Sequence, residues 1–187
     1  MSTDDRLAAI ERKLQYLTDR QEILDCIVRT SRGNDRFDVE RISGSYHPNG
    51  LHELGWKRIS GADYADHANH AHAAIAEVNL HNVTMHSCEI DGDVAHAESY
   101  VIGLFLNKDG ASSNMFAGRY ADRLEKRDGV WRIAVRRSTV EVVMSGDASI
   151  LDSDAFADRG YLKGMRDRRD VSYQRPLTLE ETAGDRW

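Results

Sequence analysis

The chain has 187 residues, which suffices for one domain with its own core but is short for two. A formal net charge of −6 at pH 7 disfavours nucleic-acid binding, because that function needs clustered positive charge. No run of 18 apolar residues occurs and the first residues are acidic, so we expect no membrane span and no signal peptide. We therefore expect a cytoplasmic protein that binds neither nucleic acid nor membranes.

Several enzyme classes are disfavoured by missing motifs. The sequence has no Gly-rich phosphate loop, no nucleophile elbow and no HExxH, which are typical of nucleotide-binding proteins, serine hydrolases and metalloproteases. The two cysteines, Cys26 and Cys88, lie far apart, and so low a count is typical of a reducing compartment. We expect both thiols to be buried as small apolar groups rather than joined in a disulfide.

The predicted elements begin with helices. Four apolar residues recur at three- and four-residue intervals, as on one face of a helix: Leu7, Ile10, Leu14 and Leu17. We expect this face to pack on the domain itself or on a neighbouring subunit. A second helix is predicted from a cap at Thr18 or Asp19 to Gly33. Shorter elements follow, namely a helix over 38–46, a turn over 46–50, a strand over 51–59 and a helix over 63–76.

The second half of the chain is predicted to form a sheet. Four segments are rich in β-branched and aromatic residues, namely 83–90, 93–106, 114–126 and 130–144. Asp-Gly turns join them, and such turns favour antiparallel hairpins. Helices followed by a long twisted sheet predict an α+β fold, a cone in which the sheet wraps around the helices and leaves a cavity. We expect the cone to span residues 1–146 and residues 147–187 to form a C-terminal extension, packed on the cone or on a neighbouring subunit.

One histidine-rich segment is a candidate metal site. His67, His70 and His72 lie at spacings of three and two residues, and on a helix only the first two share a face. Three ligands therefore do not converge from this segment alone, and histidines at a surface or a pocket rim are the commoner arrangement. We expect no metal site.

Two segments carry a family resemblance. The sequences 32-RGNDRFDVERISGSYHPNG-50 and 118-GRYADRLEKRDGVWRIAVRR-137, with His81 between them, resemble the SnoaL-like branch of the nuclear-transport-factor-2-like superfamily. Scytalone dehydratase, lindane dehydrochlorinase and bile-acid 7α-dehydratase are members of the family that the chain resembles. The resemblance covers about Arg6 to Met144, and its sharpest part, residues 125–133, indicates the fold rather than the reaction. It implies a cone-shaped α+β barrel with N-terminal helices packed into a curved antiparallel sheet.

The resemblance also implies a catalytic site. In the lyases of this family an aspartate after the second helix and a histidine entering the first long strand form a dyad, and Asp35 and His81 match those positions. An imidazole held by a carboxylate can accept a carbon-bound proton near neutral pH. Arg136 matches the place of a functional arginine and could hold an anionic leaving group. Without the family, Asp35 could cap a helix, His81 could bond within a loop, and Arg136 could form a structural ion pair.

The sequence departs from its relatives where they assist the leaving group. Asn34 and Thr30 stand where those proteins have tyrosines or a lysine. Other polar side chains must then assist, and we rank His52 first, because it lies on the segment that carries a pocket-facing phenol in scytalone dehydratase. The remaining candidates for contact with the substrate are Tyr46, Tyr100, Tyr120, Met85 and Phe116.

These observations together predict a lyase that needs no cofactor. Its Asp35–His81 dyad would abstract a proton and eliminate water, halide or formaldehyde from a small hydrophobic cyclic or aromatic compound. Two alternatives stay open, an isomerase or aldol cyclase of polyketide type and a non-catalytic small-molecule-binding module. Dehydratases of this family form trimers through the open sheet face, so a homotrimer is expected, with a dimer as the alternative.

Overall fold

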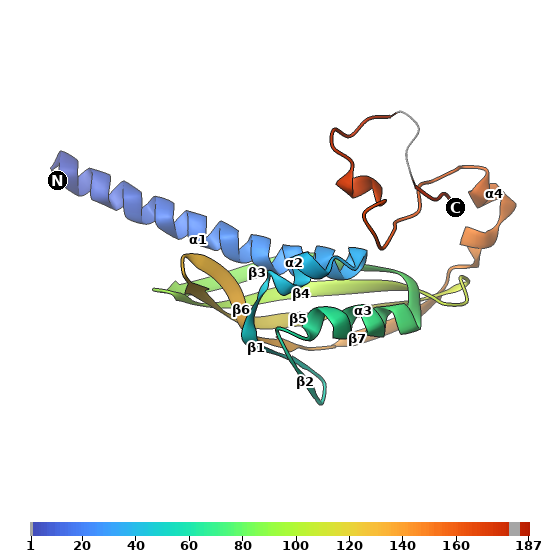
Figure 1. The fold of residues 1–187 in the computed structure, drawn as a ribbon, viewed down its shortest axis with the longest axis horizontal. Helices are drawn as coiled ribbons and strands as arrows, with labels where there is room; N and C mark the ends of the chain where they lie inside the picture. Colours follow the sequence, from blue (N-terminus) through green and yellow to red (C-terminus); the bar gives the residue numbers. More distant parts are fainter. Residues whose placement is uncertain (1, 180–183) are drawn as a thin grey trace.

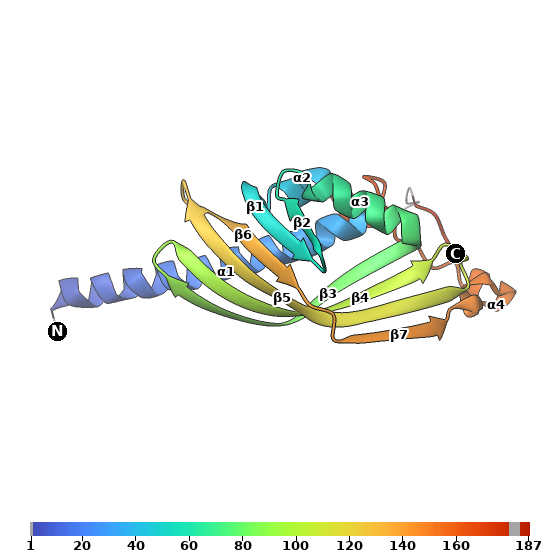
Figure 2. The ribbon, with the colours of Figure 1, turned by 90° about the horizontal axis from the view of Figure 1, so that it is seen from below.

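The computed structural model describes residues 2–179 and 184–187, and its main feature is a curved sheet with helices on its concave side (Figure 1, Figure 2). The helices are α1 (Thr3–Arg36), α2 (Val39–Ser43) and α3 (Tyr64–Ile75). The strands are β1 (Tyr46–Leu54), β2 (Lys57–Ser60), β3 (Ala76–Asp91), β4 (Val94–Asn107), β5 (Ser112–Arg127), β6 (Val130–Ser138) and β7 (Val142–Asp147). The predicted α+β fold class is confirmed. Within the described residues, no helix is both long and apolar enough to span a membrane.

The sheet is built around strand β5. The strand order is β2-β1-β6-β5-β4-β3, and β7 pairs with the first half of β5. Strands β3 to β6 form the antiparallel meander that the Asp-Gly turns predict, with Gly92 and Gly129 at positive φ angles of 57° and 76°. One pair departs from the prediction, because β1 runs parallel to β6 and makes the sheet mixed.

A single helix of 34 residues, α1, replaces the two predicted N-terminal helices. Asp19 is not a cap, because it is buried in mid-helix, where its carboxylate accepts a hydrogen bond from Trp131 Nε1 at 2.8 Å. Gly33 does not end the helix either. It packs so closely on α2 that a Cβ atom at residue 33 would lie 2.7 Å from a side-chain carbon of Ile42. The helix ends where Phe37 adopts a left-handed conformation.

Four elements predicted in or beside the sheet have other bounds in the structure. The expected turn at residues 46–50 is part of β1, and the expected strand over 51–59 is the β1–β2 hairpin. Strand β3 already begins before His81, which therefore lies inside the strand. The expected strand over 130–144 is interrupted at residues 139–141, and β6 and β7 then pair with different halves of β5.

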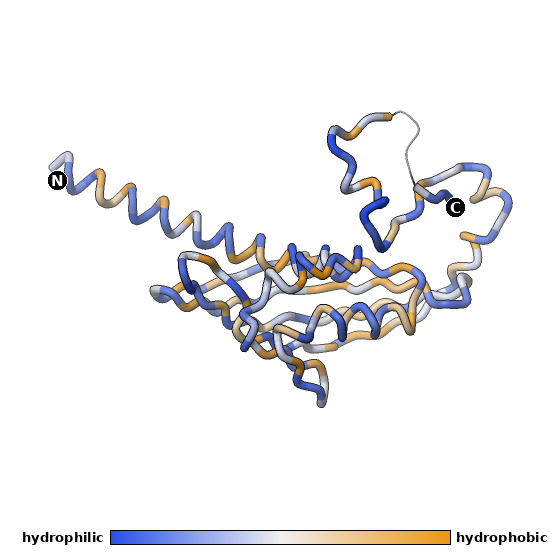
Figure 3. Tube along the Cα trace, in the orientation of Figure 1, coloured by the Kyte–Doolittle hydropathy of each residue, from blue (hydrophilic) through white to orange (hydrophobic). Residues whose placement is uncertain are grey.

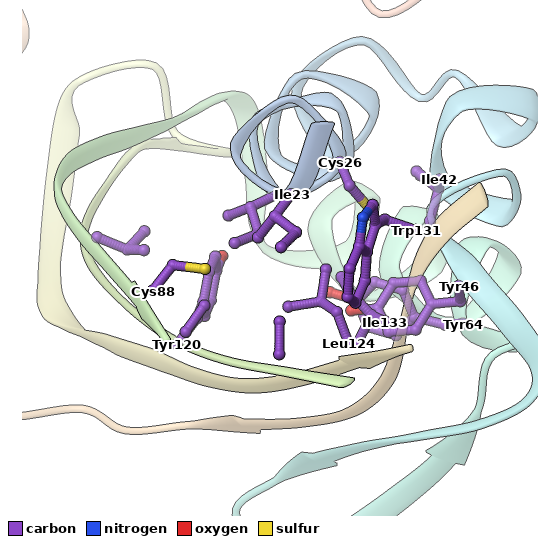
Figure 4. Packing of buried hydrophobic residues seen from close by; sticks show 14 of the residues in the cluster. Ile23, Cys26, Ile42, Tyr46, Tyr64, Cys88, Tyr120, Leu124, Trp131 and Ile133 are labelled. Atoms are coloured by element: carbon purple, nitrogen blue, oxygen red, sulfur yellow. The ribbon is translucent and has the colours of Figure 1, made fainter. Parts of the chain in front are cut away.

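The core lies between α1 and the concave face of the sheet. Its buried side chains come from the three helices α1 to α3 and from strands β1 and β3 to β6, and include Ile23, Cys26, Leu124, Trp131 and Ile133 (Figure 4). Tyr46 of β1 and Tyr64 of α3 close one end of this cluster (Figure 4). Cys26 and Cys88 are both buried and free, as the sequence predicts.

The chain after β7 returns to the end of α1. It contains the short helices η1 (Ser149–Asp152), α4 (Asp154–Ala157) and η2 (Val171–Tyr173). Arg36 Nε lies 3.3 Å from Asp170 Oδ2, which ties this segment to α1. Arg166 donates a hydrogen bond of 2.6 Å to the side-chain oxygen of Asn79 in β3. The C-terminal extension is therefore held against α1 and β3.

Candidate active site

Asp35 and His81 form a hydrogen-bonded pair. Asp35 lies in the last turn of α1, and His81 lies in β3 beside that turn. Their closest atoms, Asp35 Oδ1 and His81 Nδ1, are 2.6 Å apart. The backbone N–H of His81 also donates to both carboxylate oxygens at 3.0 Å, and Asn79 Nδ2 donates to Oδ1 at 3.1 Å. The Asp35 carboxylate is thus surrounded by N–H donors.

This geometry fixes the tautomer of His81. Because an ionised carboxylate only accepts hydrogen bonds, Nδ1 carries the proton and Nε2 keeps its lone pair. No described residue hydrogen-bonds to Nε2, and Nε2 is not among the buried atoms that lack a partner. The exposed fraction of the His81 side chain is 10%. His81 is therefore equipped to accept a proton through Nε2.

A mainly apolar cavity of about 310 Å³ lies beside His81. Its wall comes from β1, α3, β3, β4 and β5 and from the connection between β6 and β7, and includes Val101, Phe105, Phe116, Tyr120 and Val140. The Phe105 ring meets the His81 ring edge to face, with centroids 5.6 Å apart. A volume of this size is at the lower end of the range for ligand pockets and suits a small molecule.

The other side of the dyad opens into a more polar hollow of about 390 Å³ between α1, β3 and the C-terminal extension. His81 lines both spaces, whereas Asp35 lines only the polar hollow. The His81 ring lies beside the rings of His72 and Phe105, which line the apolar cavity. A small molecule in the apolar cavity would therefore lie beside the His81 ring.

Tyr120 offers the cavity a hydroxyl that is not committed elsewhere. Its side chain is buried in the part of the wall formed by β5, and no described residue hydrogen-bonds to its hydroxyl. The guanidinium carbon of Arg136 lies 3.9 Å from the centre of the Tyr120 ring. Burial raises the pKa of Tyr120 above its ordinary value, so the hydroxyl stays protonated near neutral pH and can donate a hydrogen bond.

Arg136 is completely buried behind this wall. Its Nε and Nη2 atoms donate to the two carboxylate oxygens of Asp122, each at 2.7 Å. Arg136 does not line the cavity, so the structure does not place its guanidinium where a leaving group would be. It forms the ion pair that the sequence left as the alternative, and it supports Tyr120 from behind.

His52 lies in β1 at the cavity wall, and both of its ring nitrogens are occupied. The Tyr46 hydroxyl is 3.0 Å from Nδ1, and Ser138 Oγ is 2.8 Å from Nε2. Burial, and after it the charge of Arg136, lowers the pKa of His52 well below its ordinary value, so the ring is neutral. Of the two residues that hydrogen-bond to His52, Ser138 lines the cavity and Tyr46 does not. The Ser138 hydroxyl is therefore the one to which a ligand could hydrogen-bond.

Comparison with known proteins identifies the family of the chain. Residues 15–137, more than half of its length, match the model of the SnoaL-like domain. The chain belongs to the SnoaL-like family. The match includes Asp35, His81 and Tyr120, and it leaves out the start of α1 and the C-terminal extension.

Solved structures share the fold of this SnoaL-like domain. An aspartate-to-asparagine variant of a protein of unknown function from Mycobacterium tuberculosis is 28% identical, with a TM-score of 0.61 over 68% of this chain and 74% of that one. Hexachlorocyclohexane dehydrochlorinase type 2 is 22% identical, with a TM-score of 0.67 over 72% and 93%. A Novosphingobium aromaticivorans protein provisionally named as a scytalone dehydratase is 15% identical, with a TM-score of 0.63 over 69% and 88%. The comparison with curated proteins gives no match.

Of the other side chains predicted to contact a substrate, only one lines the cavity of the SnoaL-like domain directly. Phe116 is part of the wall. Tyr46 reaches the site through its hydrogen bond to His52. Tyr100 and Met85 are 43% and 64% exposed and are not among the lining residues, so the structure does not bring them together with the dyad.

His72 lines the cavity, although it is not among the residues predicted to form the catalytic site. Its ring centroid lies 5.1 Å from that of His81, and burial lowers the pKa of His72 to about 3, so the ring is neutral. His67 and His70 do not join it, and the described residues contain no group of three metal-ligating side chains. The spacing of Tyr64, Ala68 and His72 along one face of α3 is the signal that could have identified it.

Proposed function

We propose that this SnoaL-like protein is a cofactor-independent lyase in which His81 removes a carbon-bound proton. The observation that carries the proposal is the 2.6 Å contact between Asp35 Oδ1 and His81 Nδ1 beside an apolar cavity. This contact leaves Nε2 as the basic atom that a substrate in the cavity can reach. A neutral imidazole oriented by a carboxylate is an effective general base near neutral pH, and the proposed chemistry requires no metal or organic cofactor.

In the proposed reaction, His81 Nε2 takes a proton from the carbon adjacent to the one that bears the leaving group. The C–H bonding pair forms the new C=C bond, and the leaving group departs with its own bonding pair. A halide leaves as the free anion, whereas a hydroxide takes up the proton from the His81 imidazolium and leaves as water. The Asp35 carboxylate stabilises the imidazolium while it exists.

Tyr120 is the proposed hydrogen-bond donor to the leaving group or to a substrate carbonyl. Its hydroxyl is unpartnered among the described residues and stays protonated, so it can stabilise a developing negative charge without becoming ionised. Arg136 then acts as a positioning residue, because its guanidinium stacks on the Tyr120 ring and its charge is held by Asp122. The neutral His72 ring adds no second positive charge beside the imidazolium.

The proposed substrate is a small hydrophobic cyclic compound. A cavity of about 310 Å³ with phenylalanine, valine and glycine in its wall accepts an apolar ring and offers few polar contacts. The names of two structural neighbours, a hexachlorocyclohexane dehydrochlorinase and a scytalone dehydratase, guide the choice of probes. Chlorinated cyclohexanes and cyclic β-hydroxy ketones test halide loss and water loss separately.

The test is turnover of these two probe sets in D₂O, followed by mass spectrometry. A product that has lost HCl or H₂O, absent with Asp35→Asn and His81→Ala, supports the lyase. A product of unchanged formula that carries deuterium would instead support the isomerase, since the base then returns a solvent-exchanged proton. Probe binding without any product from the unsubstituted protein would favour the binding module.

A further inference from the structure

Helix α1 has two apolar faces, and only one of them contacts the sheet. Its buried apolar residues, Ile23, Cys26 and Ile27, face the core. The other face carries what we call the heptad stripe, defined as Leu7, Ile10, Leu14, Leu17, Leu24 and Val28. The first four of these side chains are between 52% and 63% exposed. At about 3.6 residues per turn, the stripe lies on the side of the helix opposite the core.

The first half of α1 projects beyond the sheet as a free arm, residues 3–18 (Figure 1, Figure 2). The stripe recurs along this arm as apolar bands between polar ones (Figure 3). All residues of the arm except Ala8 are exposed, so no part of the described chain covers the stripe along the arm. An isolated helix in water gains little stability of its own, and an apolar stripe of this kind is stabilised by packing.

The spacing of the stripe identifies the kind of partner. Apolar residues alternate at intervals of three and four from Leu7 to Leu24, with Gln21 as the one polar residue in the series. This seven-residue repeat is the pattern of a helix that packs along another helix with the same repeat. The body of each copy lies on the opposite side of α1, away from the stripe. A second copy of the same arm therefore satisfies both the repeat and the geometry.

The charges beside the stripe distinguish the two orientations of such a pair. With Leu7 and Leu14 at heptad position a, Arg6 is at position g and Glu11 at the following position e. In a parallel pair these two positions of different copies lie opposite each other. In an antiparallel pair centred between Ile10 and Leu14, Glu11 would face Glu11 and Lys13 would face Lys13. Arg6, Glu11 and Lys13 make no ion pair among the described residues. The parallel arrangement joins opposite charges, whereas the antiparallel one joins like charges.

We propose that the arms of two copies of this chain pair as a parallel coiled coil through the heptad stripe. This association does not depend on the proposed lyase function. It is also distinct from a trimer formed through the open sheet face, which stays a prediction from the family resemblance. The start of the arm, residues 3–14, lies outside the SnoaL-like match, whereas Leu17, Leu24 and Val28 lie within it.

Disulfide trapping in the full chain tests the orientation directly. Leu14→Cys places a thiol within the parallel seam, where it meets the same thiol of a second copy, and we expect a cross-linked dimer on a non-reducing gel. Arg12→Cys is the matched control, because it lies on the other side of the exposed arm and should not cross-link. The unsubstituted chain controls for Cys26 and Cys88, which are buried. Equal cross-linking at positions 12 and 14, or none at 14, would overturn the proposal.

Charge exchange provides a second test that unfolding does not mimic. In the Leu14→Cys background, Arg6→Glu and Glu11→Arg each place like charges across the parallel pair, and cross-linking of each variant alone should fall several-fold. Mixing the two variants restores opposite charges between unlike chains, and the cross-link should recover. Recovery on mixing supports the parallel pair. Failure to recover, with each variant still folded by circular dichroism, would contradict it.

Discussion

The carboxylate of Asp35 binds His81 at two places, at ring Nδ1 with a distance of 2.6 Å and at the backbone N–H with 3.0 Å. One residue at the end of α1 thereby sets both the tautomer of the imidazole and the position of the strand that carries it. The two contacts have different effects. The ring contact orients the imidazole, whereas the backbone contact holds β3 against α1.

Replacing Asp35 by asparagine is therefore expected to lower turnover of any probe substrate by about 100- to 10,000-fold. The amide has nearly the same shape but carries no charge, so it no longer stabilises the imidazolium, and only one of its two terminal atoms can accept a hydrogen bond where both Asp35 oxygens accept. His81→Ala should cause a loss of the same order. The double variant should lose little more than either single one, since the two residues act as a unit. Independent, multiplying losses would contradict a dyad.

Tyr120→Phe and Tyr46→Phe form a matched pair that separates chemistry from packing. The Tyr120 hydroxyl has no partner in the described part of the chain, so its removal should lower kcat by about 100-fold and leave the free energy of unfolding nearly unchanged. Tyr46→Phe leaves His52 Nδ1 buried without its partner, which should cost about 1 to 3 kcal/mol in urea unfolding. A Tyr120→Phe enzyme of full activity would remove this hydroxyl from the mechanism.

The buried pair of Arg136 and Asp122 should behave as a stability element. Arg136→Met leaves the Asp122 carboxylate buried without its bidentate partner, and we expect a loss of about 3 to 5 kcal/mol in the free energy of unfolding. The double variant Arg136→Met with Asp122→Leu removes both charges and should be more stable than Arg136→Met alone. Denaturant unfolding of the four proteins gives the coupling energy. A coupling near zero would contradict the ion-pair assignment.

Acid sensitivity should depend on His72. Its pKa is about 3 in the folded protein and about 6.5 in the unfolded chain, so between these values only the unfolded chain binds the proton. The stability contributed by His72 is thus complete above pH 6.5 and is lost as the pH falls toward 3. His72→Gln should lose less stability than the unsubstituted protein between about pH 7 and about pH 5, as measured by urea midpoints. The His70→Gln variant is the matched control, because it removes an exposed histidine of the same helix that does not line the cavity.

The parts of this molecule that follow from local sequence were predictable. Asp-Gly turns at 91 and 128 specify hairpins through two residues each, and the meander forms as expected. The positions of Asp35 and His81 were predictable through the family resemblance, although the backbone contact between them was not. Their pairing across 46 residues of sequence arises from how α1 lies on β3, and no local pattern encodes that.

The remaining errors share a physical cause, which is that a distant partner changed the role of a residue. Asp19 has the local propensity of a helix cap, but Trp131, 112 positions away, gives its carboxylate a buried hydrogen bond and the helix continues. The role predicted for His52 stays untested, but the parallel pairing of β1 with β6 brings Ser138 to its second nitrogen, a contact that the sequence did not indicate. Those partners exist only in the folded chain, so propensity and spacing do not reveal them.

The interruption between β6 and β7 has a consequence for how this scaffold can diverge. Thr139, Val140 and Glu141 lie outside both strands, and the first two line the cavity. At this point the chain passes so close to Gly118 that a Cβ atom there would lie 2.0 Å from the Thr139 carbonyl oxygen. The backbone N–H groups of Thr139 and Glu141 also donate hydrogen bonds to carbonyl oxygens of β5, those of Arg119 and Ala117. The connection therefore pairs with β5 and lines the cavity at the same time, so a change in its length or sequence is expected to alter the edge of the sheet and the shape of the cavity together.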